Sequence, residues 1–207
     1  ETRTLKAGEC VLIDMGCIWN GYCSDMTRTF YCKSVDEEQA AIHDLVRTAV
    51  EKAEAIIKPG VRFCDIDAQA RDLIGEAGYG EYWKIRLGHF IGQEDHEYGD
   101  VSPINKNVAE PGMIFSIEPG IYIEGSHGVR LENELLVCEG EKNEYGEFLY
   151  FEPITYVPFD LDAINPDIMN AEDKERLNTY HATVYEKVSP YLNDEEKEWL
   201  KKYTRAI

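Results

Sequence analysis

The sequence predicts an α+β domain in which helices cover a sheet built from antiparallel strands. Asn20-Gly21 separates two strand-like runs, and two amphipathic helical segments follow at residues 36–57 and 65–77. Strand-like segments carrying Glu118 and Glu132 then flank a Gly-rich turn. Helices that are apolar on one face are expected to bury that face against a sheet built from such strands.

The first predicted strands run from Val11 to Gly16 and from Tyr22 to Phe30. Asn-Gly is a strong signal for a two-residue hairpin turn. This turn pairs Asp14 with Thr27 and Asp25 with Gly16. The two aspartates are then diagonal neighbours on one face, about 7–8 Å apart at the backbone. That separation allows both carboxylates to reach a single metal cluster.

The predicted helices are recognised by their apolar spacing and by the residues that end them. Residues 36–57 carry one apolar face and stop at Lys58-Pro59-Gly60, and residues 65–77 are closed by Gly78. From residue 141 we expect a polar loop, followed by a strand over residues 148–159. Residues 171–207 are predicted to be helical, with Asn170 and Asn193 as N-caps.

The 207 residues suit one large domain, or a domain with an appendage. Because the chain opens on Glu1 rather than Met, we expect an N-terminal part of the protein to be missing from it. No apolar run approaches the length of a membrane span, which favours a cytoplasmic protein. The six cysteines form no Cys-x-x-Cys pair, so reduced thiols are expected.

The charge balance bears on the partners of the protein. Forty acidic residues against 21 basic ones give a net charge of −19. A phosphate backbone would be repelled, which argues against a nucleic-acid partner. Much of this charge serves solubility, whereas acidic groups buried together would need a cation.

Five residues lie in or beside apolar, strand-like segments, where an ionised group is costly unless it is compensated. They are Asp14, Asp25, His89, Glu118 and Glu132. Four carboxylates and one imidazole can hold two divalent cations, with Mn²⁺ favoured and Zn²⁺ or Co²⁺ as alternatives. Such a pair can lower the pKa of a shared water and polarise a carbonyl, which predicts hydrolysis of an amide or ester.

A series of motifs resembles the metal-binding pattern of the pita-bread metallopeptidases, a family that includes methionine aminopeptidase, prolidase and aminopeptidase P. The motifs are Ile13-Asp14 with Gly16, Tyr22-x-x-Asp25-x-Thr27-Arg28-Thr29-Phe30, Gly88-His89-x-x-Gly92, His96-Glu97, Ile117-Glu118-Pro119-Gly120 and Gly128-Val129-Arg130-Leu131-Glu132. Order, spacing and residue type agree at all five ligand positions. The resemblance implies a pita-bread fold, with a curved, mainly antiparallel sheet and covering helices, that is N-terminally incomplete in this chain.

The resemblance extends into the C-terminal part of the chain. Phe151-Glu152-Pro153-Ile154-Thr155, Leu177-Asn178-x-Tyr180-His181, Ser189-Pro190 and Trp199-Leu200 are similar to the C-terminal extension of three-domain aminopeptidase P proteins. It implies that residues 1–156 form the C-terminal portion of the catalytic domain. Residues 157–207 would form the extension, through which similar proteins dimerise, so a homodimer is expected.

The resemblance also implies how the metal ligands are shared. Asp14 would chelate one metal ion, and Asp25 and Glu132 would bridge both ions. His89 and Glu118 would complete the second site.

Further roles follow from the same resemblance. Glu118 would also act as the general base. His96 matches a histidine that stabilises the tetrahedral intermediate or contacts the substrate. Arg130 matches the arginine that orients the ligand aspartate. Tyr122, near Glu118, is a weaker candidate for a residue that supports the ligands or binds the substrate.

The activity implied is release of the N-terminal residue from peptides with proline in second position. The proline-specific members usually carry a histidine four residues before the ligand histidine, where this chain has Ile85. Two alternatives to an Xaa-Pro aminopeptidase therefore stay open. One is a prolidase-type dipeptidase or a peptidase of relaxed selectivity, and the other is an inactive, peptide-binding relative of the same fold.

Overall fold

The computed structural model describes residues 3–56 and 60–207 and has the predicted α+β architecture. It divides into two compact units, Glu1–Thr155 and Tyr156–Ile207. Each unit is described by itself below. The proposed metal ligands all belong to the first unit.

The first unit opens with a long antiparallel hairpin of β1 (Cys10–Trp19) and β2 (Tyr22–Tyr31). Asn20 and Gly21 connect the strands with φ angles of 50° and 85°. Positive φ at both positions is what a type I′ turn requires, and it explains why Asn-Gly stands there. The predicted register is confirmed, because Asp14 pairs with Thr27 and Gly16 with Asp25.

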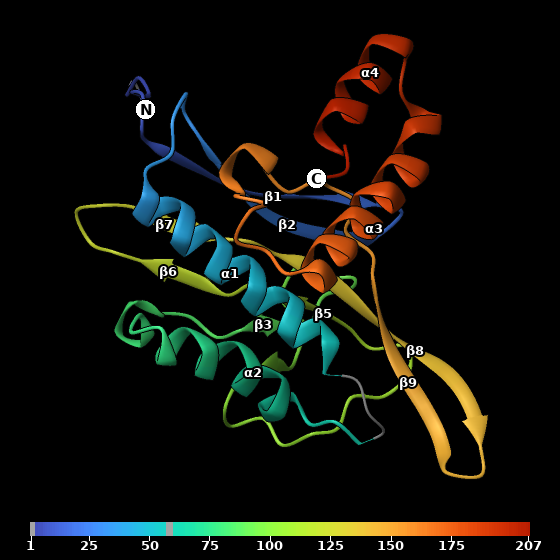
Figure 1. Cartoon of the computed structure of the whole chain (residues 1–207). Coiled ribbons are helices and arrows are strands. Elements are labelled where there is room, and N and C mark those ends of the chain that lie inside the picture. The colour runs from blue at the N-terminus through green and yellow to red at the C-terminus, as the bar shows by residue number, and fades with distance from the viewer. Residues whose placement is uncertain (1–2, 57–59) are drawn as a thin grey trace. The chain divides into compact units, whose positions relative to one another are not determined.

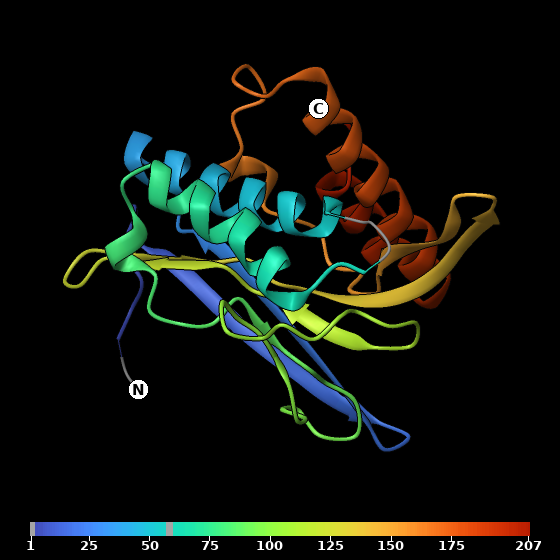
Figure 2. The ribbon, with the colours of Figure 1, turned by 90° about the horizontal axis from the view of Figure 1, so that it is seen from below.

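Two helices, α1 (Glu37–Ala55) and α2 (Phe63–Glu76), pack against each other on one side of the strands, with the β1–β2 hairpin on the other side (Figures 1 and 2). Asp36 and Gln39 form a capping box at the start of α1. The end predicted for this helix, at residue 57 before Lys58-Pro59, lies outside the described residues. The packed faces are fully buried at Ile42, Val46, Ala49, Ala53, Ile66, Ala70 and Ile74.

In the described part of the first unit, the antiparallel strands fall into four groups. The hairpin described above is one, and β3 (Gly88–His89) with β4 (Asp100–Val101) is the second. The third has the order β5-β8-β9, from β5 (Ile114–Ile117), β8 (Asn133–Asn143) and β9 (Gly146–Pro153). The fourth pairs β6 (Gly120–Tyr122) with β7 (Gly128–Arg130), and a short 3₁₀ turn, η1 (Gly80–Tyr82), precedes β3.

The prediction of a polar loop from residue 141 was wrong in part. The strands β8 and β9 continue through this polar stretch as a hairpin, with Lys142 opposite Glu147 and Asn143 opposite Gly146. Gly146 has a φ of 134°, which suits the tight connection, and Lys142 forms an ion pair with Glu147. The strand predicted to reach residue 159 instead ends at Pro153, which has no N–H to donate to a ladder.

The second unit contains η2 (Leu161–Ala163), α3 (Ala171–Val188), η3 (Ser189–Tyr191) and α4 (Asp194–Tyr203). Asn170 and Asn193 are the N-caps of the two long helices, as predicted. Within the unit His181 is buried, and its Nε2 accepts the backbone N–H of Phe159 at 3.1 Å.

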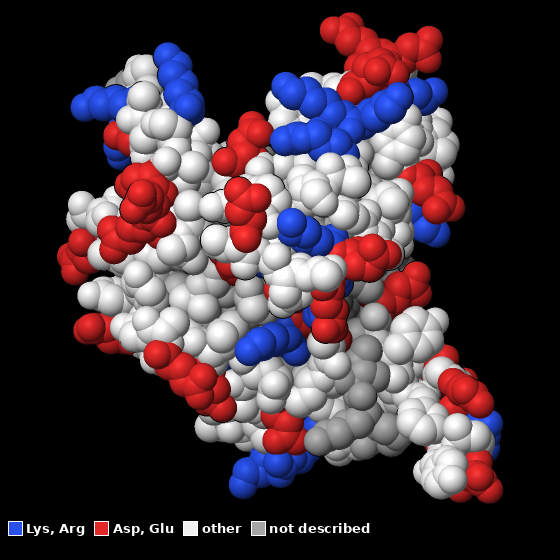
Figure 3. All heavy atoms as spheres, viewed as in Figure 1, with Lys and Arg blue, Asp and Glu red and all other residues white. Residues whose placement is uncertain are grey.

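Among the described residues, no helix has the length and apolar character needed to cross a membrane. On the face drawn in Figure 3, acidic side chains are scattered between Lys and Arg rather than gathered in one patch.

Candidate metal centre

The β1–β2 hairpin brings Asp14 and Asp25 to one region because their positions are diagonal in the register. Gly16, opposite Asp25, lies very close to the partner strand: a Cβ there would stand 1.8 Å from the carbonyl oxygen of Ser24. The close approach of β1 to β2 beside Asp25 therefore requires glycine.

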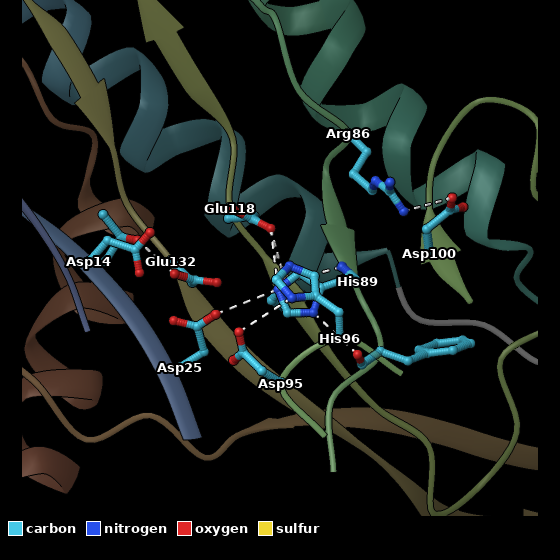
Figure 4. A network of polar contacts seen from close by, with 12 residues as sticks. Asp14, Asp25, Arg86, His89, Asp95, His96, Asp100, Glu118 and Glu132 are labelled. Atoms are coloured by element: carbon cyan, nitrogen blue, oxygen red, sulfur yellow. Dashed lines mark hydrogen bonds and ion pairs between the residues drawn. The ribbon is translucent and has the colours of Figure 1, made fainter. Parts of the chain in front are cut away.

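His89 on β3 is buried and lies between two carboxylates from other segments. Its Nε2 is 3.5 Å from Oδ2 of Asp25 and 3.6 Å from Oε1 of Glu118 (Figure 4). The backbone N–H of His89 donates to Oγ of Ser116 at 3.1 Å. A Cβ on the preceding Gly88 would stand 1.8 Å from the Ser116 carbonyl oxygen, so β3 and β5 are in backbone contact here.

Glu132 lies in the short connection between β7 and β8 and is 1% exposed. Its Oε2 accepts a hydrogen bond of 2.7 Å from Oγ1 of Thr27, whereas Oε1 is buried with no hydrogen-bond partner among the described residues. Ligand atoms of Glu132, Asp25 and His89 all lie within 4.8 Å of one another. An unsatisfied buried carboxylate oxygen beside two further donors fits a bound cation.

The pKa values within the site show how costly this concentration of charge is. Burial, and then the nearby Glu118 and Asp25 carboxylates, raise the pKa of Glu132 to about 8. Burial also raises the pKa of Glu118. For His89, burial lowers the pKa, but the hydrogen bond with Asp25 and the other acidic neighbours outweigh it and raise the pKa to about 9. Bound cations would replace these protons.

Arg130 on β7 connects several of the predicted residues. Its Nη2 donates to Oδ2 of Asp14, its Nη1 to the Tyr122 hydroxyl at 2.7 Å, and its Nε to Oγ1 of Thr27 at 3.1 Å. Nε is also 3.6 Å from Oε2 of Glu118. The guanidinium group thus contacts two of the predicted ligands and fixes their orientation.

His96 lies on the solvent side of this group. Its ring is tilted against that of His89, with 4.0 Å between the centroids and 33° between the planes. The side chain is 69% exposed, and its Nδ1 is 3.3 Å from Oδ2 of Asp95. The structure therefore places His96 beside the candidate metal centre, within reach of a ligand that enters from solvent.

Three polar residues of the site had no role in the sequence-based prediction. Thr27 donates to Glu132, Ser116 contacts the His89 backbone and Oε1 of Glu118, and Glu134 accepts the N–H of Asp25 at 2.6 Å. One signal was available, because Ser116 and Glu134 stand two residues from Glu118 and Glu132. Apart from the contact of Ser116 with Glu118, these contacts join residues far apart in the sequence and could not be deduced from spacing.

Comparisons with known proteins place these observations in a family. Residues 1–139 match the model of metallopeptidase family M24, and residues 147–207 match the C-terminal region of peptidase M24. An uncharacterized peptidase of Staphylococcus saprophyticus is 51% identical over 137 residues, which are 66% of this chain and 39% of that protein. The chain thus spans about two fifths of the length of the curated relatives that it matches.

Solved structures give the same result for the fold. X-prolyl aminopeptidase from Caenorhabditis elegans, described as a cytosolic enzyme with a di-nuclear active site, is 25% identical and has a TM-score of 0.85 over 96% of this chain and 33% of its own. Prolidase from Pyrococcus furiosus is 36% identical, with a TM-score of 0.66 over 73% of this chain and 43% of its own. The chain has the pita-bread fold and belongs to metallopeptidase family M24.

Proposed function

We propose that these residues form the metal-bearing part of an Xaa-Pro aminopeptidase, which releases the N-terminal residue from peptides with proline in second position. The observation that carries the proposal is the convergence of the half-buried Asp25 with the buried His89 and Glu132, with one Glu132 oxygen unpaired among the described residues. The likeness to X-prolyl aminopeptidase, which extends over 96% of the chain, supports this choice of substrate.

We assign two divalent cations to Asp14, Asp25, His89, Glu118 and Glu132. Four of the five side chains offer carboxylate oxygen, which favours Mn²⁺. Structural Zn²⁺, by contrast, is often bound by thiolates. When bound, the ions would polarise the scissile carbonyl and lower the pKa of the nucleophilic water.

The side chains of the site would carry the proton transfers. The raised pKa of Glu118, caused first by burial, suits a general base that takes a proton from the attacking water. As the C–N bond breaks, Glu118 gives that proton to the leaving nitrogen. His96 would donate a hydrogen bond to the carbonyl oxygen as negative charge develops there. Arg130, with Tyr122 on its other side, would keep Asp14 in place.

A prolidase-type dipeptidase is the second candidate, favoured by the 36% identity with Pyrococcus furiosus prolidase. Ile85 stands four residues before His89, where the proline-specific enzymes that this chain resembles usually have a histidine.

The six cysteines are free, which supports our assignment of the protein to the cytoplasm, where thiols stay reduced.

The proposal is tested with the full chain loaded with Mn²⁺ and assayed on Xaa-Pro dipeptides and on longer Xaa-Pro peptides. We expect turnover of the longer peptides, and a loss of about 10²–10⁴-fold in kcat in Glu118→Gln with proline selectivity retained. Turnover of dipeptides alone would establish the prolidase. A chain that binds peptide, but does not bind Mn²⁺ and does not hydrolyse the peptide, would be the inactive relative.

A further inference from the structure

We propose that Ser116 and Glu134, a facing pair on β5 and β8, are positioning residues that set the spacing of three of the proposed metal ligands. The inference rests on the proposed metal centre. The pair connects Asp25, His89 and Glu118, which come from three different segments of the first unit.

The two side chains share one face of the sheet. Ser116 on β5 lies directly opposite Glu134 on β8 in the antiparallel register. Side chains of directly opposed residues point to the same face and lie close together. Ser116 is 0% exposed and Glu134 is 6% exposed, so both polar groups are withdrawn from water and need protein partners.

Ser116 connects two of the proposed ligands through a single hydroxyl. Its Oγ accepts the backbone N–H of His89 at 3.1 Å and donates to Oε1 of Glu118 at 3.4 Å. His89 is thereby fixed at its backbone and Glu118 at its carboxylate. Loss of the hydroxyl would free the Glu118 carboxylate to turn and would leave a buried N–H of His89 unpaired.

Glu134 fixes the third ligand from the opposite strand. Its Oε1 accepts the backbone N–H of Asp25 at 2.6 Å. The main chain of Glu134 is itself held, since its N–H donates to Oγ1 of Thr155 at 2.8 Å and its carbonyl accepts the N–H of Ile154 at 3.0 Å. The carboxylate therefore ties β2 to β8 at the residue proposed to bridge both ions.

These contacts matter because metal affinity depends on how well the ligands are placed before the ion binds. Removing an outer residue that orients a ligand typically weakens metal binding 10–100-fold. Ser116 and Glu134 are directly opposed residues of two hydrogen-bonded strands. The pair therefore fixes the positions of the three ligands relative to the same two strands. A residue that only stabilised the fold would change the melting temperature without changing the affinity for Mn²⁺.

The test compares variants of the full chain by titration calorimetry with Mn²⁺ after removal of bound metal. In Ser116→Ala and in Glu134→Met we expect a 10–100-fold higher dissociation constant. Glu134→Gln keeps an oxygen that accepts the Asp25 N–H, so its dissociation constant should stay within about threefold of wild type. Peptidase activity lost at low Mn²⁺ should return as the Mn²⁺ concentration is raised, with KM for peptide unchanged.

A matched control carries the same kind of change away from the site. Glu51→Gln alters a buried glutamate of α1 that binds Arg47, and it should retain wild-type affinity for Mn²⁺. The inference is overturned if Ser116→Ala and Glu134→Met bind Mn²⁺ like wild type, or if Glu134→Gln is as weak as Glu134→Met. Absence of Mn²⁺ binding in wild type would overturn the proposed function as well.

Discussion

Glu132 shows at the scale of one residue why a metal centre fits this site. The carboxylate is buried, accepts one hydrogen bond from Thr27, and leaves its other oxygen without a partner among the described residues. Burial, followed by the nearby Glu118 and Asp25 carboxylates, raises its pKa to about 8, so without a cation the group binds a proton. The neighbouring Glu134, for which burial is again the largest cause, has a pKa raised to about 7.

These two shifts predict the pH dependence of the metal-free protein. Both glutamates bind protons in the folded state at pH values where the unfolded chain, with a pKa near 4.5, has released them. Their contribution to the free energy of unfolding is therefore fully present below about pH 4.5 and is lost as pH rises through 7 and 8. Urea denaturation of the chelator-treated full chain should show this loss between pH 5 and pH 8, and Mn²⁺ should reverse it.

Glu132→Gln is the control for this prediction. The amide cannot ionise, so the metal-free variant should lose less stability than wild type over the same pH interval. Equal losses in variant and wild type would show that Glu132 does not carry the effect.

At the scale of the element, local sequence signals predicted much of the fold. Asn20-Gly21 determined the register of β1 and β2, and thereby the neighbouring positions of Asp14 and Asp25. The N-caps at Asn170 and Asn193 were also predictable, because such caps act within one turn. The extension of β8 and β9 through residues 141–147 was not, since cross-strand pairing overrode the polar composition.

Helix α1 carries a further group with a shifted pKa, His43. The sequence did not distinguish it from an ordinary helix residue. His43 is 0% exposed, and burial, followed by the charges of Arg47 and Arg28, lowers its pKa to about 4. Its ring packs edge-on against that of Tyr31, with 5.9 Å between the centroids. The folded protein thus holds this histidine neutral.

The neutral His43 predicts a loss of stability in acid. The unfolded chain binds a proton at about pH 6.5, whereas the folded chain does so at about pH 4. The contribution of His43 to the free energy of unfolding is therefore fully present above pH 6.5 and declines as pH falls, by about 3 kcal/mol at pH 4. His43→Leu should have a flatter decline between pH 6.5 and pH 4 in urea denaturation, and an unchanged decline would contradict the assignment.

At the scale of the whole molecule, the family could be predicted, because residues of matching type stand at matching spacings at five positions, and their role as metal ligands stays a prediction. The distances between them could not be predicted. Asp14 and Glu132 are separated by more than half of the chain, and their relation depends on how β2, β7 and β8 pack. The contacts of Ser116 with His89, of Thr27 with Glu132 and of Glu134 with Asp25 likewise exist only once distant strands are assembled.

The second unit bears on the expected homodimer. Ile168, Tyr191 and Trp199 are apolar or aromatic side chains of this unit that are 64%, 88% and 58% exposed. Exposed groups of this kind often lie in protein interfaces. We expect light scattering to give twice the mass of the full chain, and Tyr191→Ser with Trp199→Ser to shift the protein towards the monomer.

Tyr98→Ser supplies the matched control for the dimer, because Tyr98 is fully exposed in the first unit. It should leave the measured mass unchanged. A monomer at every concentration of the wild-type protein would contradict a homodimer formed through the C-terminal region.

The two glycine contacts beside the site affect how firmly the positions of its strands are fixed. Gly16 and Gly88 bring main chain against main chain next to Asp25 and His89, with room for no Cβ. A side-chain contact can relax by rotation about its χ angles, but a contact between two backbones has no such freedom. The separation of the strands that carry these two residues is therefore a property of the polypeptide backbone, and it tolerates changes in the side chains around it.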